Sequence, residues 1–135
     1  MEIEEALTTY LLAQSGLTAL IERRFFYDIL PEKCELPAVC VINISDVKDH
    51  TLTGQLKLER PVFQFTAYAQ TKAQAKIVAE QIKKALQDFQ GSMSGIEIQY
   101  IKLLNELSTL YTSPDGLIQA YTTDLEFEIN YVRSD

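Results

Sequence analysis

The sequence contains little of what enzyme active sites are usually built from. Its 135 residues include one histidine, His50, and two cysteines, Cys34 and Cys40. Five residues separate the two cysteines, unlike the close cysteine pairs of zinc sites. The five glycines are scattered singly, so the chain has no glycine-rich phosphate loop. We therefore expect no metal site, no bound cofactor and no enzymatic activity.

Basic residues are also scarce relative to acidic ones. The chain has 12 lysines and arginines against 19 aspartates and glutamates, which gives a net charge of −7. A protein that grips a nucleic-acid backbone needs clustered lysine and arginine. The charge balance therefore argues against specific DNA binding, although it does not argue against DNA passing close to the protein.

Long hydrophobic runs are missing as well. No stretch approaches the roughly 18 apolar residues of a membrane-spanning helix. The first residues, Met1–Leu12, carry glutamates where a secretory signal peptide carries basic residues. We expect a soluble protein that is made in the cytoplasm, does not contact membranes and keeps its cysteines reduced.

The patterns that are present predict one α+β domain spanning residues 1–135. Apolar residues at helical spacing predict an N-terminal helix, a short second helix, and a longer helix that starts after Thr71, where Thr71 and Gln74 fit a capping box. Alternating apolar and polar residues predict strands at Ala38–Val47, Val62–Ala69, Ile96–Tyr100 and Leu117–Val132. The expected fold is a two-layer sandwich with an antiparallel four-stranded sheet, helices packed on one face, and the order α-α-β-β-α-β-β.

Three carboxylates in the last strand form a row. Asp124, Glu126 and Glu128 are spaced two residues apart, so they should face the same side of the strand. Paired catalytic carboxylates need different environments so that their pKa values separate, and a uniform row does not provide this. Two interpretations remain open, a solvated sheet face and the acidic lining of a channel.

The cysteines offer one further catalytic hypothesis. A small thiol enzyme could use Cys34 with His50 as its base, but nothing in the sequence orients that base. Cys40 lies in the apolar run AVCVINI, which favours a buried structural role. A disulfide between the two cysteines is the other alternative.

The polar segment Asp49–Arg60 is the least regular part of the chain. Its threonines and its glycine provide few apolar anchors, so it could be a catalytic loop or an arm that contacts a partner. We interpret it as a partner-binding loop whose candidate contact residues are Asp49, His50, Thr51, Leu52, Gln55, Lys57, Leu58, Glu59 and Arg60.

The order of these segments resembles a known family over essentially the whole chain. The matching pattern is an N-terminal helix pair, a basic residue and aromatics before a proline, then LPAVCVINISD, HTLTG, ERPVFQFTAYAQTKAQAKIVAEQ and the ending YTSPDGLIQAYTTDLEFEIN. This pattern is similar to the phage tail-completion family, also called tail-to-head joining or tail terminator proteins.

The resemblance implies a structural virion protein of phage or prophage origin. It would cap the completed tail tube as a ring, commonly a hexamer, at the head-proximal end of a long tail. Its implied partners are other copies of itself, the tail tube protein and the head-connector protein, while DNA passes through the hole without specific binding. The alternative function is a cytoplasmic small-molecule-binding regulatory α+β module.

Overall fold

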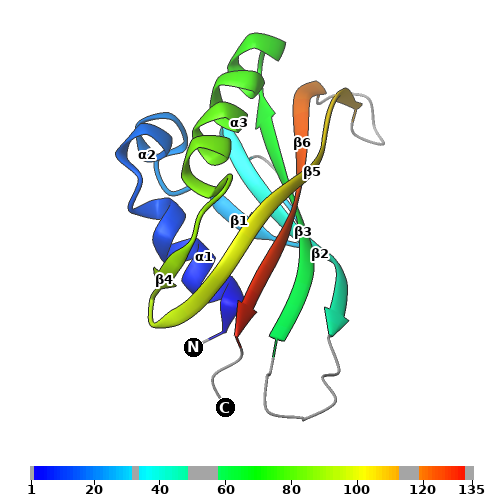
Figure 1. Ribbon diagram of the computed structural model, residues 1–135. Coiled ribbons are helices and arrows are strands. Elements are labelled where there is room, and N and C mark those ends of the chain that lie inside the picture. Colours follow the sequence, from blue (N-terminus) through cyan, green and yellow to red (C-terminus); the bar gives the residue numbers. More distant parts are fainter. Residues whose placement is uncertain (1, 32–33, 49–57, 113–118, 133–135) are drawn as a thin grey trace.

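A computed structural model describes residues 2–31, 34–48, 58–112 and 119–132 of the chain. These residues form helices and strands that pack into two layers, with the helices on one side of a curled sheet (Figure 1). The elements are α1 (Ile3–Leu12), α2 (Ser15–Ile21), β1 (Phe25–Tyr27), β2 (Ala38–Lys48), β3 (Leu58–Ala69), α3 (Lys72–Leu86), β4 (Gly91–Met93), β5 (Ile96–Thr112) and β6 (Gln119–Val132).

The described strands form one six-stranded sheet in the order β1-β2-β3-β6-β5-β4. β1 runs parallel to β2, and every other neighbouring pair is antiparallel. The long strands β2, β3, β6 and β5 form the centre of the sheet, and the three-residue strands β1 and β4 lie at its two edges.

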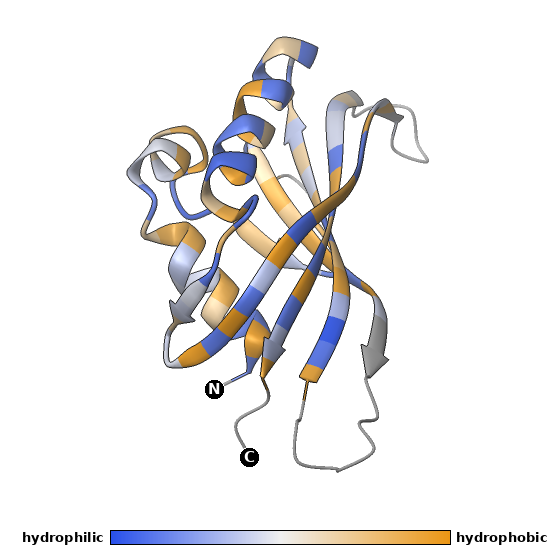
Figure 2. Ribbon diagram, viewed as in Figure 1, coloured by the Kyte–Doolittle hydropathy of each residue, from blue (hydrophilic) through white to orange (hydrophobic). Residues whose placement is uncertain are grey.

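The core lies between the sheet and the helices. Phe63 and Phe65 of β3 and Phe127 of β6 are fully buried, and the rings of Phe65 and Phe127 meet edge to face with centroids 5.8 Å apart. The helices contribute apolar stripes at helical spacing to this core. Hydrophobic and hydrophilic residues alternate along the helices and the strands (Figure 2). Burying one face of each central strand leaves the opposite face of the sheet without a helix.

α3 begins where the sequence predicts a cap. The Thr71 hydroxyl accepts a hydrogen bond of 3.1 Å from the backbone N–H of Gln74, which satisfies one of the open donors of the first turn. The place of Gly91 in the sequence, just past the apolar stripe of this helix, predicts a left-handed cap at that residue. This prediction is wrong, because α3 ends at Leu86 and Asp88 takes the positive φ of 62°. Gly91 instead begins β4.

The expected four-stranded antiparallel sheet with the order α-α-β-β-α-β-β is wrong. The sheet has six strands, and two of them, β1 and β4, were not predicted. The sheet is mixed because β1 pairs with β2 in parallel. A strand of three residues is too short to show an alternating pattern, which is the property that identifies strands in a sequence. β3 and β5 also extend beyond their predicted bounds, starting at Leu58 and ending at Thr112 respectively.

Tyr27 joins the first edge of the sheet to α1. Its hydroxyl oxygen lies 2.7 Å from the carbonyl oxygen of Glu4 and 2.7 Å from the hydroxyl oxygen of Thr8, which itself donates to Glu4 O at 2.8 Å. Burial raises the pKa of Tyr27 to about 12, while the hydrogen bond with Thr8 lowers it and the charge of Glu4 raises it. The neutral phenol is therefore the form that the fold stabilises.

We predict that replacing Tyr27 with phenylalanine costs about 1 kcal/mol of unfolding free energy at pH 7, the usual net value of a hydrogen bond. Because the pKa is raised in the folded state, this contribution is complete below pH 10 and disappears as the pH rises toward 12. Denaturant unfolding of both proteins at pH 7 and pH 11.5 measures the effect. A difference between the two proteins that is unchanged at pH 11.5 would contradict the assignment.

Candidate assembly surface

The helix-free face of the sheet carries the acidic row predicted from the sequence. Asp124, Glu126 and Glu128 alternate along β6 with Leu125 and Phe127, whose side chains are buried toward the helices. All three carboxylates are half-buried among the side chains of neighbouring strands. The structure therefore places the row in one line on one face, which is the geometry that the spacing predicts.

The neighbours of the row hold two of its carboxylates in place. The hydroxyl of Thr66 on β3, which is only 5% exposed, donates to Asp124 Oδ1 at 2.7 Å. The side-chain amide of Asn130 donates to Glu128 Oε1 at 3.2 Å. Both donors are neutral groups that carry no positive charge. Hydrogen bonds to neighbouring side chains therefore fix the positions of two carboxylates on this face.

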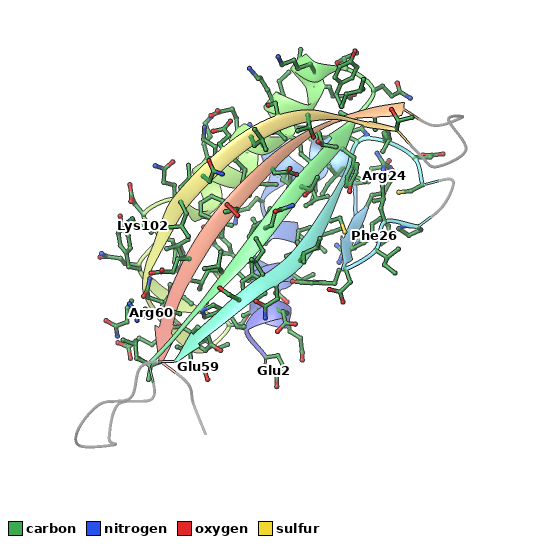
Figure 3. The ribbon with its side chains drawn as sticks, turned by 90° about the vertical axis from the view of Figure 1, so that its right-hand side faces the viewer. Glu2, Arg24, Phe26, Glu59, Arg60 and Lys102 are labelled. Atoms are coloured by element: carbon green, nitrogen blue, oxygen red, sulfur yellow. The ribbon has the colours of Figure 1, made fainter. Side chains whose placement is uncertain are left out.

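Basic side chains lie at one end of the acidic row. Lys102 of β5 is the register partner of Glu128, and Arg60 of β3 lies two residues before Val62, the partner of Glu128 on the other side. Figure 3 shows Lys102 and Arg60 toward the same end of the sheet. The face is therefore acidic around Asp124 and Glu126 and mixed in charge around Glu128.

Most of the predicted partner-binding loop lies outside the described residues. This applies to Asp49, His50, Thr51, Leu52, Gln55 and Lys57. The remaining candidates, Leu58, Glu59 and Arg60, lie at the start of β3, where Glu59 accepts a hydrogen bond from the hydroxyl of Tyr131. These three residues are therefore part of the sheet rather than of a loop.

The structure contains a hollow at the same end of the sheet, with a volume of about 540 Å³. It is lined by Leu58, Gln99, Tyr100, Asn130 and Val132. None of the lining side chains is a carboxylate, histidine or cysteine, and the described residues contain no group of three or more such side chains placed to hold a metal ion. The hollow offers a surface for contact rather than a set of groups for catalysis.

The cysteines do not have the environment of an activated nucleophile. Burial raises the pKa of the Cys34 thiol, which outweighs the lowering effect of the nearby Arg24 guanidinium. Burial also raises the pKa of Cys40, which is 3% exposed, and both thiols are free. A catalytic thiolate needs the opposite shift. The proposed base, His50, lies outside the described residues.

One edge of the sheet, formed by β5, is largely uncovered in the described part of the chain. β4 pairs with β5 only at 96–98, and the backbone N–H of Asp88 donates to Ile101 O at 3.0 Å. From 102 to 112 the described strands leave β5 with β6 as its single neighbour. A bare strand edge is a template for pairing with another chain.

The opposite edge, formed by β2, is covered in a similar, partial way. β1 pairs with β2 only at 39–41, so that from 42 to 48 the described strands leave β2 with β3 as its single neighbour. Ile42 and Ile44 on this part of β2 are exposed. The sheet therefore has a partly open edge on each side.

Sequence reasoning missed the β5 edge because bulges disturb its alternating pattern. Register shifts occur between Ile98 and Tyr100 and between Leu103 and Asn105. Each shift places one extra residue in the strand and reverses which face the following side chains occupy. The only sequence pattern that remained was a cluster of leucines at positions 103, 104, 107 and 110, whose spacing is closer to that of a helix.

A comparison with protein families identifies the family of the chain. Residues 5–129 match the family described as tail completion protein gp17. The chain belongs to the tail completion protein gp17 family. The resemblance seen in the sequence is therefore confirmed, and the protein is a structural component of the phage tail that is located in the virion.

A solved structure shares the fold of this tail completion protein. It is described as the virion of a native gene transfer agent (GTA) particle, and one of its chains aligns with a TM-score of 0.68 and 17% sequence identity. The alignment covers 97% of this chain and 98% of that chain. No curated protein matches the sequence. In the described residues, no helix is both long and apolar enough to cross a membrane.

Proposed function

We propose that this tail completion protein forms a ring that caps the finished tail tube and joins the tail to the head connector. The observation that carries the proposal is the family match over residues 5–129, because completing a tail requires a protein at the end where the tube stops growing. The expected ring is a hexamer, as the family resemblance implies. Its partners are other copies of this chain, the tail tube protein and the head-connector protein.

The layered architecture supports a ring with a defined inside and outside. All three helices of the described chain pack on one face of the sheet, so the two faces differ in both shape and charge (Figure 1). In a cyclic assembly every subunit presents the same face to the hole. We infer that the helix-free face points inward and that the helices form the outer layer.

The acidic row suits a surface that DNA passes without binding. If the helix-free face lines the hole, Asp124, Glu126 and Glu128 are repeated once per subunit around the path of the DNA. A carboxylate and a phosphate about 4 Å apart repel each other by roughly 1 kcal/mol in bulk water and by more where water is excluded. The row would thus keep DNA from adhering, while Lys102 at one end moderates the repulsion.

The segment Asp49–Arg60 is proposed to contact the neighbouring tail component. Its described end, Leu58–Arg60, enters the sheet beside the hollow lined by Tyr100 and Asn130. A contact at this end of the sheet would lie at one end of the ring rather than between subunits, if the strands run roughly along the ring axis.

The proposed function predicts a specific defect when the protein is absent. Phage made without it should contain tails of uncontrolled length, or tails of normal length that do not join heads, because no ring closes the tube. Electron microscopy of the lysate shows either outcome directly. Supplying the gene in trans should restore joined particles. Normal, head-joined tails in its absence would contradict the proposal.

The inward position of the acidic row predicts a salt-dependent effect on DNA release. Glu126→Lys with Glu128→Lys should leave assembly intact but slow DNA ejection, most strongly at low ionic strength, where charges are least screened. Asp124 is left unchanged because its hydrogen-bond donor, the Thr66 hydroxyl, is buried and would lose its acceptor, whereas the donor to Glu128, Asn130, is half-buried. Ejection is followed by the release of labelled DNA from purified particles.

Two variants separate this effect from a change in net charge. Glu2→Lys with Glu5→Lys makes the same charge change on exposed residues of the helical layer and should eject DNA at the wild-type rate. Glu126→Gln with Glu128→Gln should give an intermediate rate. Equal rates for all variants at low salt would show that the row is only a solvated face.

A further inference from the structure

The open edge of β5 lacks the features that normally prevent edges from pairing. From Asn105 to Thr112 the strand pairs regularly with β6, without a bulge, a proline or a lysine. Its single charged residue, Glu106, is bound to Lys83 of α3 at 2.9 Å. Soluble proteins usually protect long edges with such features. An unprotected edge of eight residues in a tail protein therefore indicates an interface.

Exposed apolar side chains accompany this edge. Leu107 is 55% exposed and Leu110 is 52% exposed, although they lie on opposite faces of β5. On the other edge of the sheet, Ile42 and Ile44 are 40% and 46% exposed. Both edges thus combine backbone groups that no described strand pairs with and apolar side chains whose exposure to water is unfavourable.

The directions of the two edge strands match each other. β2 is antiparallel to β3, β3 to β6, and β6 to β5, so β5 runs antiparallel to β2. If a second copy were placed beside the first with the same orientation, its β2 would continue the antiparallel alternation next to β5. Leu107 and Ile42 also share the helix-free face, because they are aligned with Asp124 and Gln64.

We propose that β5 of one subunit, between residues 105 and 112, pairs antiparallel with β2 of the next subunit, between residues 42 and 48. The sheets would then run continuously around the ring, with Leu107 of one copy near Ile42 or Ile44 of the next. This inference rests on the proposed ring and specifies how its subunits contact each other.

Symmetry explains why the two different edges pair rather than two copies of β5. Pairing of β5 with β5 uses the same edge of both copies, so the assembly stops at a dimer. Pairing of β5 with β2 leaves one β5 edge and one β2 edge open at the two ends of any incomplete oligomer, so that further copies can add. Such head-to-tail contacts end only when rotation brings the last β5 to the first β2. The proposed ring of more than two subunits therefore needs head-to-tail contacts between β5 and β2.

A charge placed on the β5 edge tests the proposal. Leu107→Lys should reduce the fraction of tails that carry this protein by roughly tenfold or more, since a lysine on an edge strand opposes pairing. Its matched control is Ile77→Lys on α3, where the side chain is 52% exposed in the helical layer and belongs to neither edge strand. Binding is measured by adding each purified variant to tails that were assembled without the protein.

The folded state of each variant is checked by circular dichroism and thermal unfolding, and both should resemble wild type because each replaced side chain is exposed. Loss of binding by Leu107→Lys alone supports the edge contact. Wild-type binding by Leu107→Lys would overturn it.

Cysteine cross-linking identifies which strands meet. In a Cys34→Ser, Cys40→Ala background, Leu107→Cys combined with Ile42→Cys or with Ile44→Cys should form disulfides between copies and yield a ladder that ends at the closed ring. Leu107→Cys alone should not cross-link. A disulfide requires Cα atoms about 4.4–6.8 Å apart, so only directly adjacent strands can form one.

The other results have distinct meanings. A disulfide-linked dimer of Leu107→Cys alone would show that β5 pairs with β5. A cross-link to the tail tube protein would show that a different protein occupies the β5 edge. Either result overturns the proposal. Rings on tails with no cross-link in either pair would overturn the edge contact but leave the proposed function intact. Absence of any ring from wild-type protein on tails would overturn both.

Discussion

The burial of one face of β6 and β3 against the helices is the constraint on which the rest of the structure depends. Phe65 and Phe127 meet at the centre of the core, and every second residue on each strand must follow them inward. The residues between them are therefore directed to the opposite face. The acidic row is a consequence of this alternation, because Asp124, Glu126 and Glu128 occupy the positions that the core leaves over.

The same constraint leaves the edges of the sheet as the places where another subunit can add. The helices cover one face of the sheet. The other face carries charged side chains, and burying them without oppositely charged or hydrogen-bonding partners would be costly. The short strands β1 and β4 cover only three residues of each edge. The described part of a subunit therefore has a partly open strand edge on each side, which suits the proposed assembly into a ring.

The parts of the fold that could be predicted are those with an undisturbed period. The face assignment of β6 and the cap at Thr71 followed directly from residue spacing, because nothing interrupts the alternation or the helical repeat there. β5 could not be recognised in full because two bulges shift its alternation, and its exposed leucines then look like part of a helix. The three-residue strands contain too few residues for a period, and β1 is fixed by its pairing with β2 rather than by its own sequence. The candidate acidic row was found from spacing, whereas the open edges depend on which strands are neighbours and needed the three-dimensional structure.

The central claim is that this tail completion protein forms a ring at the junction between tail and head. A cryo-electron microscopy reconstruction of the neck of the intact particle tests it most directly. The account predicts one closed ring of this chain between the last ring of the tail tube and the head connector, with the helices outside and β6 facing the hole. Finding the chain elsewhere in the particle, or finding its helices around the hole, would contradict the account.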